Sequence, residues 1–337
     1  MMKRQKKLLW VMVFVLAAVL AVGGTAMAAK KVQFVGIATG GTGGLYYPLG
    51  GALAQVISSK IPDVSATAQS GNASVANVNL VAQDEVETAF IQNNVLDSAY
   101  FGRDQWQGKP LKNLRVIASL YPETIQICAL KSANIKIVSD ARGKRVMLGD
   151  KGSGSEFDAR NILNAHGLTY DMIKPDYVGW EVASQRLKDD QGDMLFQTAG
   201  YPASFIIDLT TTKEVNLVSL SDDAIKKLCA QYKFYVPSTI PPKTYRGQDQ
   251  EVKSIAMMAL WVTHDGVSEK LVYEMTKALW EKGNMANRKD QSVGAEILAK
   301  VVPETGKFIR LKNALEGITT PLHPGAERYY KEKGMLK

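Results

Sequence analysis

Apolar and polar positions along the chain predict strands and helices in alternation. Residues 32–37 form an apolar run typical of a strand, residues 64–68 alternate as a short strand, and residues 86–91 are again apolar. Helical spacing joins Leu45, Leu49, Leu53, Val56 and Ile57, and a second helix is expected over residues 73–82. This β-α-β-α-β order predicts an α/β fold with a mainly parallel sheet covered by helices.

The middle of the chain repeats this order. We expect strands at residues 114–120, 124–130, 145–149, 194–198, 215–220 and 255–262, and a helix over residues 156–165. Residues 271–279 carry an apolar helical face, so the end of the chain is expected to be helical.

Two α/β blocks and a helical tail predict a two-lobed protein. We expect lobe 1 over residues 29–121, lobe 2 over 122–250, and a return to lobe 1 over 251–337, with the tail packed on lobe 1. The chain would cross between the lobes near residues 118–124 and 248–256. A cleft between two lobes is a common place for a ligand.

The first 28 residues have the pattern of a signal peptide. Lys3, Arg4, Lys6 and Lys7 precede fifteen consecutive apolar residues, and an Ala-x-Ala motif ends at Ala28. A membrane span needs about 20 apolar residues, so we expect cleavage after Ala28 and export to the periplasm. A transmembrane anchor is the alternative.

Charge and composition exclude several classes. The net charge is +8, of which the N-terminal cluster supplies +4, and the remainder has no basic block with interleaved aromatic residues. Nucleic-acid binding is therefore not expected. No metal-binding spacing joins the three histidines and two cysteines, and no cofactor motif is complete. We favour free buried thiols for Cys128 and Cys229, although export permits a disulfide.

Three polar loops follow predicted strands and precede predicted helices, at residues 39–44, 70–74 and 150–155. In open α/β sheets, ligands bind beyond the carboxyl ends of strands. Unpaired N–H groups at a helix start attract anions, and glycine lets an anion approach them closely. Two such helix starts facing one carboxylate would hold it without an arginine.

A purely structural interpretation stays open for these loops. Glycine-rich turns are common, and Ser153 or Ser155 would satisfy a capping box with Glu156 or Asp158. Nucleotide-binding motifs are incomplete because Tyr46 and Phe157 stand where the last glycine would be. A serine hydrolase motif is absent from the sequence.

Six motifs in order resemble the TAXI solute receptors, the binding proteins of one branch of TRAP transporters. They begin at Gly40, Phe90, Gly152, Gly200, Tyr245 and Pro321, and reach from the glycine loop to the sequence Pro-Leu-His-Pro-Gly-Ala-Glu-Arg-Tyr-Tyr. Asn94 and Ser155 depart from the family, which often has Asp and Thr there.

The resemblance implies a type II periplasmic binding protein fold, with two lobes hinged by two crossing segments. It also implies a small carboxylate ligand, such as glutamate or 2-oxoglutarate, that passes to the membrane permease subunits of a TRAP transporter. A monomer that is not an enzyme is expected. An exported enzyme and a periplasmic sensor are the alternatives.

The loop chemistry and the resemblance together predict a ligand-binding site. The hydroxyls of Thr42, Ser153 and Ser155 and the N–H groups of Gly43, Gly44 and Gly154 are expected to hold the carboxylate. The rest of the solute is expected to contact Tyr47, Asn72, Gln92, Asn93, Gly200 and Tyr201.

Overall fold

The computed structural model describes residues 32–282 and 293–337, so the predicted signal peptide lies outside the described residues. Residues 34–337 form one compact unit. Its strands are β1 (Gln33–Ala38), β2 (Val64–Gln69), β3 (Thr88–Gln92), β4 (Leu114–Leu130), β5 (Arg145–Met147), β6 (Lys174–Asp176), β7 (Met194–Ala199), β8 (Val215–Leu217), β9 (Val236–Ile240) and β10 (Val252–His264).

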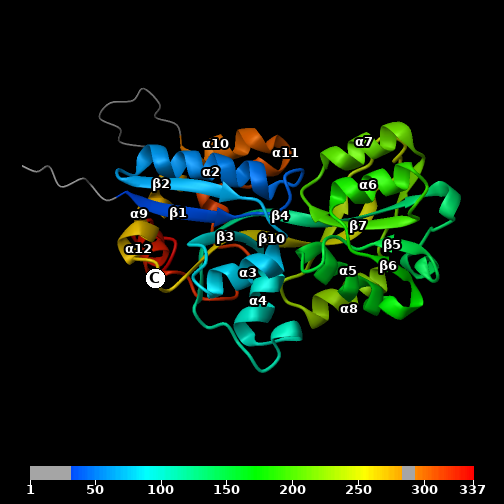
Figure 1. The fold of residues 1–337 in the computed structure, drawn as a ribbon, viewed down its shortest axis with the longest axis horizontal. Helices are drawn as coiled ribbons and strands as arrows, with labels where there is room; N and C mark the ends of the chain where they lie inside the picture. Colours follow the sequence, from blue (N-terminus) through cyan, green and yellow to red (C-terminus); the bar gives the residue numbers. More distant parts are fainter. Residues whose placement is uncertain (1–31, 283–292) are drawn as a thin grey trace, which may run out of the picture. The chain divides into compact units, whose positions relative to one another are not determined.

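Helices lie on both faces of these strands (Figure 1). They are α2 (Tyr46–Lys60), α3 (Ser74–Ala82), α4 (Asn93–Phe101), α5 (Gly154–Ala165), α6 (Trp180–Lys188), α7 (Ser204–Thr212), α8 (Asp222–Gln231), α9 (Glu269–Trp280), α10 (Gly294–Val301), α11 (Pro303–Gly306) and α12 (Pro324–Glu332). Short 3₁₀ helices occur at Asp104–Trp106, Lys131–Ala133, Val138–Ala141, Tyr170–Met172 and Leu311–Asn313.

The sheet is mixed rather than mainly parallel. Among the described residues its order is β2-β1-β3-β10-β4-β7-β5-β6, with β8 beside β4 and β9 beside β10. β1 and β3 are parallel, as are β5, β6 and β7, but β10 runs antiparallel to both β3 and β4. The prediction of a mainly parallel sheet is therefore wrong at the centre, where β4 and β10 connect the two parallel groups.

β4 is one continuous strand where the sequence predicted two. The apolar pattern predicted strands at residues 114–120 and 124–130, and Pro122 lies between them with no N–H to donate to a ladder. The structure instead pairs Pro122 with Met258 and shifts the register between Ala259 and Leu260. The shift leaves Leu120 of β4 as an extra residue, and the strand continues through the proline.

The buried apolar residues divide into three clusters. One draws only on residues between Ile125 and Met257. The other two combine residues that precede Ile125 with residues that follow Met257, and Phe157 is the exception in one of them. We call residues 122–251 the middle segment and residues 34–121 and 252–337 the outer segments. The division supports the predicted lobes, whose boundaries stay a prediction.

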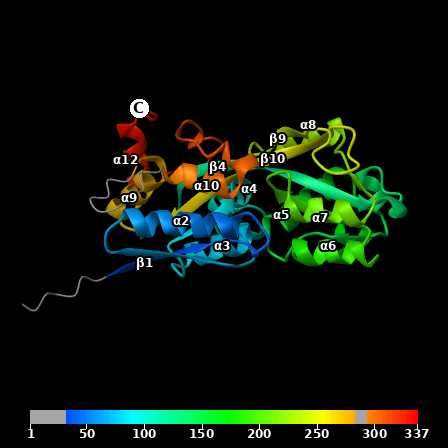
Figure 2. The ribbon, with the colours of Figure 1, turned by 90° about the horizontal axis from the view of Figure 1, so that it is seen from above.

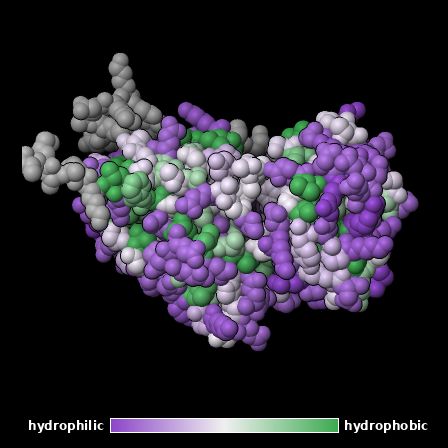
Figure 3. All heavy atoms as spheres, in the orientation of Figure 1, coloured by the Kyte–Doolittle hydropathy of each residue, from purple (hydrophilic) through white to green (hydrophobic). Residues whose placement is uncertain are grey.

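The helical tail packs on α2, as the view from above shows (Figure 2). Leu53 of α2, Leu279 of α9 and Leu298 of α10 share one buried cluster. Tyr330 of α12 extends this packing, because its hydroxyl donates to the Ile117 carbonyl of β4 at 2.9 Å and accepts from Trp280 Nε1 at 3.1 Å. Hydrophilic side chains predominate on the face in Figure 3, with smaller apolar patches between them.

Replacing Tyr330 by Phe should destabilise the protein by about 1–3 kcal/mol, because the Trp280 N–H would lose its buried acceptor. Urea denaturation measures the change. Tyr273→Phe is the control, since the Tyr273 hydroxyl bonds Glu332 at the surface; its cost should stay within about 0.5 kcal/mol. If both variants lost the same free energy of unfolding, the buried hydrogen bond between Trp280 and Tyr330 would not be the cause of the loss.

Candidate functional site

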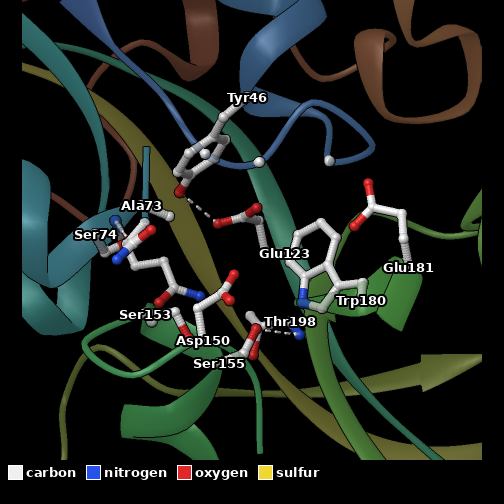
Figure 4. A pocket seen from close by; sticks show the side chains of 16 residues that line it. Tyr46, Ala73, Ser74, Glu123, Asp150, Ser153, Ser155, Trp180, Glu181 and Thr198 are labelled. Atoms are coloured by element: carbon white, nitrogen blue, oxygen red, sulfur yellow. Dashed lines mark hydrogen bonds between the residues drawn. The ribbon is translucent and has the colours of Figure 1, made fainter. Parts of the chain in front are cut away.

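A cavity of about 40 Å³ lies where the outer and middle segments meet (Figure 4). Because one water molecule needs about 10–15 Å³ by this measure, the cavity holds a few waters, and a larger solute requires it to widen. The lining residues are Gly40, Gly41, Gly44, Tyr46, Asn72, Ala73, Ser74, Gln92, Glu123, Asp150, Ser153, Gly154, Ser155, Trp180, Glu181 and Thr198.

Four helices begin at this cavity. The first residues of α2, α3, α5 and α6 all line it, at Tyr46, Ser74, Gly154 and Trp180. A helix start leaves backbone N–H groups without intrahelical partners and carries partial positive charge. No side chain caps α2, α3 or α6, whereas Ser153 caps α5. The cavity is therefore surrounded by N–H groups suited to an anion.

Close packing explains three of the glycines. A Cβ on Gly43 would overlap the Glu181 carboxylate, and one on Gly44 would lie 2.7 Å from the Trp180 ring. A Cβ on Gly154 would overlap the Gln92 amide. These glycines therefore allow the loops of one segment to contact side chains of the other.

Acidic side chains line the same cavity. Glu123 of β4 is 3% exposed and accepts a hydrogen bond from the Tyr46 hydroxyl at 2.8 Å. Burial raises its pKa to about 8, and the nearby Asp158 carboxyl adds to that rise. Asp150 and Glu181 also line the cavity (Figure 4). Burial, and then the charge of Glu181, raise the pKa of Asp150. The lining residues include no lysine or arginine among those described.

Behind the lining, the fully buried Asp158 of α5 joins both segments. Its carboxylate accepts hydrogen bonds from Asn94 Nδ2 at 2.6 Å and Gln92 Nε2 at 3.2 Å, both in outer segments. From the middle segment it accepts the hydroxyls of Thr198 and Tyr235, each at 2.7 Å. Burial raises the pKa of Asp158 to about 7, while these four donors favour its ionised form.

One polar atom at the cavity, Gln92 Oε1, is buried and has no hydrogen-bond partner among the described residues. Gln92 lines the cavity, and its oxygen is an acceptor that lacks a donor. Since a buried acceptor without a donor costs free energy, Gln92 marks a position where a ligand N–H would be stabilising.

The structure brings half of the predicted site residues to this cavity. Gly44, Asn72, Gln92, Ser153, Gly154 and Ser155 line it. Ser153 Oγ accepts the Glu156 N–H and Ser155 Oγ accepts the Thr198 N–H, each at 3.1 Å. The capping interpretation therefore holds for Ser153, and both hydroxyls retain a proton to donate.

The other predicted residues lie elsewhere. Thr42 and Tyr47 are exposed, and Gly43 contacts Glu181 without lining the cavity. The Asn93 amide bonds the backbone of Gly317 and Met258.

Gly200 and Tyr201 line a second cavity of about 440 Å³, which Pro122, Thr124, Pro202, Ser238, Pro241, Thr244, Thr305, Lys307 and Phe308 complete. Pro122 and Thr124 flank Glu123 on β4. Because side chains alternate along a strand, they face this second cavity while Glu123 faces the first.

Sequence reasoning missed Glu123, Trp180, Thr198 and the acids Asp150 and Glu181. Glu123 had a signal, since it is the one acid in the 17-residue strand β4. A buried strand tolerates such a residue only with hydrogen-bonding partners. Trp180 and Glu181 begin α6, which the apolar pattern did not predict.

Other chemistry is not evident in the part of the chain that the structure describes. Within it, no group of three or more His, Cys, Asp or Glu side chains is arranged to hold a metal ion. Cys128 is a buried free thiol, and Cys229 is a half-buried one. Among the described helices, none has the length and apolar character needed to cross a membrane.

Comparison with known proteins identifies the fold. A family model described as the NMT1-like family matches residues 37–334. PhnD1 from Prochlorococcus marinus in complex with methylphosphonate is similar in structure, with a TM-score of 0.52, 11% identity, and coverage of 91% of this chain and 100% of that one. A putative L-cystine ABC transporter from Listeria monocytogenes has a TM-score of 0.50, 13% identity, and coverage of 81% and 98%. The prediction of a type II periplasmic binding protein fold is confirmed.

These comparisons correct the resemblance to TAXI receptors. The matching model is that of the NMT1-like family, and the similar structures include a protein described as an ABC transporter. The assignments to the TAXI family and to a TRAP transporter are wrong. Glycine-serine loops at helix starts follow from tight turns and anion binding in many α/β proteins, so such motifs do not distinguish one receptor family from another.

Replacing Asp158 by Asn should destabilise the protein by about 2–4 kcal/mol, because an amide oxygen cannot accept all four buried donors. Asp208→Asn, at an exposed partner of Lys188, should cost less than about 1 kcal/mol. Chemical denaturation of both variants measures the difference. A small loss for Asp158→Asn would show that the four hydrogen bonds do not connect the segments.

Proposed function

The chain belongs to the NMT1-like family, and on that basis we propose that it is an extracytoplasmic solute-binding protein. It captures a small carboxylate, of the glutamate or 2-oxoglutarate type, and delivers it to a membrane permease. The signal-peptide pattern of residues 1–28 supports export of the chain.

The convergence of four helix starts on one cavity carries this proposal. Each exposed helix start stabilises an anion by about 0.3–1 kcal/mol, and by up to about 2 kcal/mol when partly buried. With three of the four starts uncapped by side chains, their N–H groups can donate to the oxygens of a carboxylate. A lysine or arginine is not needed for such an anion site.

The arrangement of the lining also supports capture by closure. α2 and α3 belong to an outer segment, and α5 and α6 belong to the middle segment. A solute that contacts all four favours the state in which the two segments approach each other, to the extent that it binds this state more tightly. The predicted lobes, 29–121 with 251–337 and 122–250, are the bodies that would move.

A solute held in this way is sequestered rather than transformed. The cavity holds hydrogen-bond donors, acceptors and three acids. Its hydroxyls on Ser153 and Ser155 accept backbone N–H groups, so neither is activated by a neighbouring base as a nucleophile would be. Binding without turnover is therefore the function that the site supports best.

A thermal-shift screen of small carboxylates tests the proposal. At a ligand concentration 100 times Kd, binding adds about 2.7 kcal/mol to stability, which raises the unfolding midpoint by several degrees. Carboxylates should stabilise the protein, and the corresponding neutral amides should not. If no carboxylate shifts the midpoint, the proposal is wrong.

Asn72→Ala should weaken carboxylate binding about 5–10-fold, because Asn72 lines the cavity and its amide can bond the solute. Isothermal titration of the best carboxylate measures the change. Asn164→Ala, at an exposed position near the end of α5, is the control and should bind like the unaltered protein. Equal affinities in all three proteins would place the solute elsewhere.

A further inference from the structure

Glu123 stands out among the residues that line the cavity. It is buried in the centre of a strand, and one carboxylate oxygen accepts the Tyr46 hydroxyl. No basic side chain accompanies it among the lining residues described. The cavity therefore combines two features with opposite electrostatic effects. Its helix starts stabilise a negatively charged ligand group, and the buried acid stabilises a positively charged one.

Gln92 provides independent evidence for a nitrogen-bearing ligand. Its Nε2 donates to Asp158, which leaves Oε1 buried without a donor at the cavity. A carboxylate ligand cannot satisfy this atom, because a carboxylate is itself an acceptor. An ammonium group has three N–H donors, so it can satisfy Gln92 Oε1 and also bond Glu123.

We propose that Glu123 and Gln92 form an ammonium subsite, which selects an amino acid over the matching keto acid, and that capture of this ammonium group releases a proton from Glu123. The inference rests on the proposed function and specifies its substrate class. In the empty cavity Glu123 is a neutral acid. When the ammonium group enters, the Glu123 O–H bond breaks, the carboxylate pairs with the ammonium, and the proton passes to solvent buffer.

The surroundings of Glu123 support its neutral form before capture. Burial, together with Asp158 of α5, disfavours its charge and raises its pKa. The hydroxyls of Tyr46 and Tyr121 act in the opposite direction but do not outweigh burial. Met257 opposes Glu123 on β10. Asp150 and Glu181 share the cavity as further acids. Because burial outweighs these hydrogen bonds, the ionised form gains most from the arrival of an opposite charge.

Proton release gives a direct measurement. Titration calorimetry of glutamate into the protein, in two buffers of different ionisation enthalpy, reports the protons released for each solute bound. Since the pKa of Glu123 is about 8, close to one proton should be released at pH 7, and the number should fall toward zero as the pH rises above 8. Affinity for glutamate should rise as the pH approaches 8 and level off above it, and glutamate should bind at least tenfold more tightly than 2-oxoglutarate at pH 8.

Glu123→Gln is the decisive variant, because it keeps the shape of the side chain and removes the proton. It should release no proton on binding and should lose most of the preference for glutamate over 2-oxoglutarate. Glu156→Gln is the matched control, since this half-buried acid on α5 bonds Tyr170 outside the cavity, and it should retain both properties. Thermal unfolding of each variant without ligand confirms that it is folded.

The outcomes separate the two proposals. If the unaltered protein binds a carboxylate with no proton release, or binds both solutes equally, the ammonium subsite is wrong and the proposed function stands. If Glu123→Gln releases as many protons as the unaltered protein, the released proton does not come from Glu123 and the inference is overturned. If no carboxylate binds at all, the proposed function fails and the ammonium subsite fails with it.

Discussion

The buried carboxylate of Asp158 is the constraint on which the site depends. It collects two amide donors from outer segments and two hydroxyl donors from the middle segment. These donors fix Gln92 and Thr198, which line the cavity. Asn94 is suited to this role because its amide donates; an acid at that position would place two carboxyl groups in contact. The geometry of the cavity is therefore set by a residue that does not line it.

The cavity combines two electrostatic preferences in a small volume. Backbone N–H groups at four helix starts favour negative charge, and three acids favour positive charge. A molecule carrying both charges would satisfy both sets, which distinguishes this site from one built around an arginine.

The pattern of apolar residues predicted those helices and strands whose formation depends on the burial of one face of the element itself. Apolar spacing identified β1, β2, α3, α5 and β7 to within one or two residues, since each has one buried face or a fully buried run. The continuity of β4 through Pro122 could not be predicted, because it depends on pairing with β10, which lies more than 100 residues further along the chain. Similarly, the loops indicated Ser153 and Gly154, but Glu123 and Trp180 reach the cavity through pairings distant in sequence. The motifs also suggested the wrong family, since they report loop geometry that unrelated receptors share.

The alternation of β4 around Glu123 has a consequence for how this protein tolerates change. Pro122 and Thr124 face a cavity of about 440 Å³, while Glu123 faces the smaller one. Adding or removing a single residue in this stretch would exchange the two faces of the strand. The Glu123 carboxyl group would then face the larger cavity. Descendants of this sequence should therefore vary here by substitution, and insertions and deletions should accumulate in the surface connections.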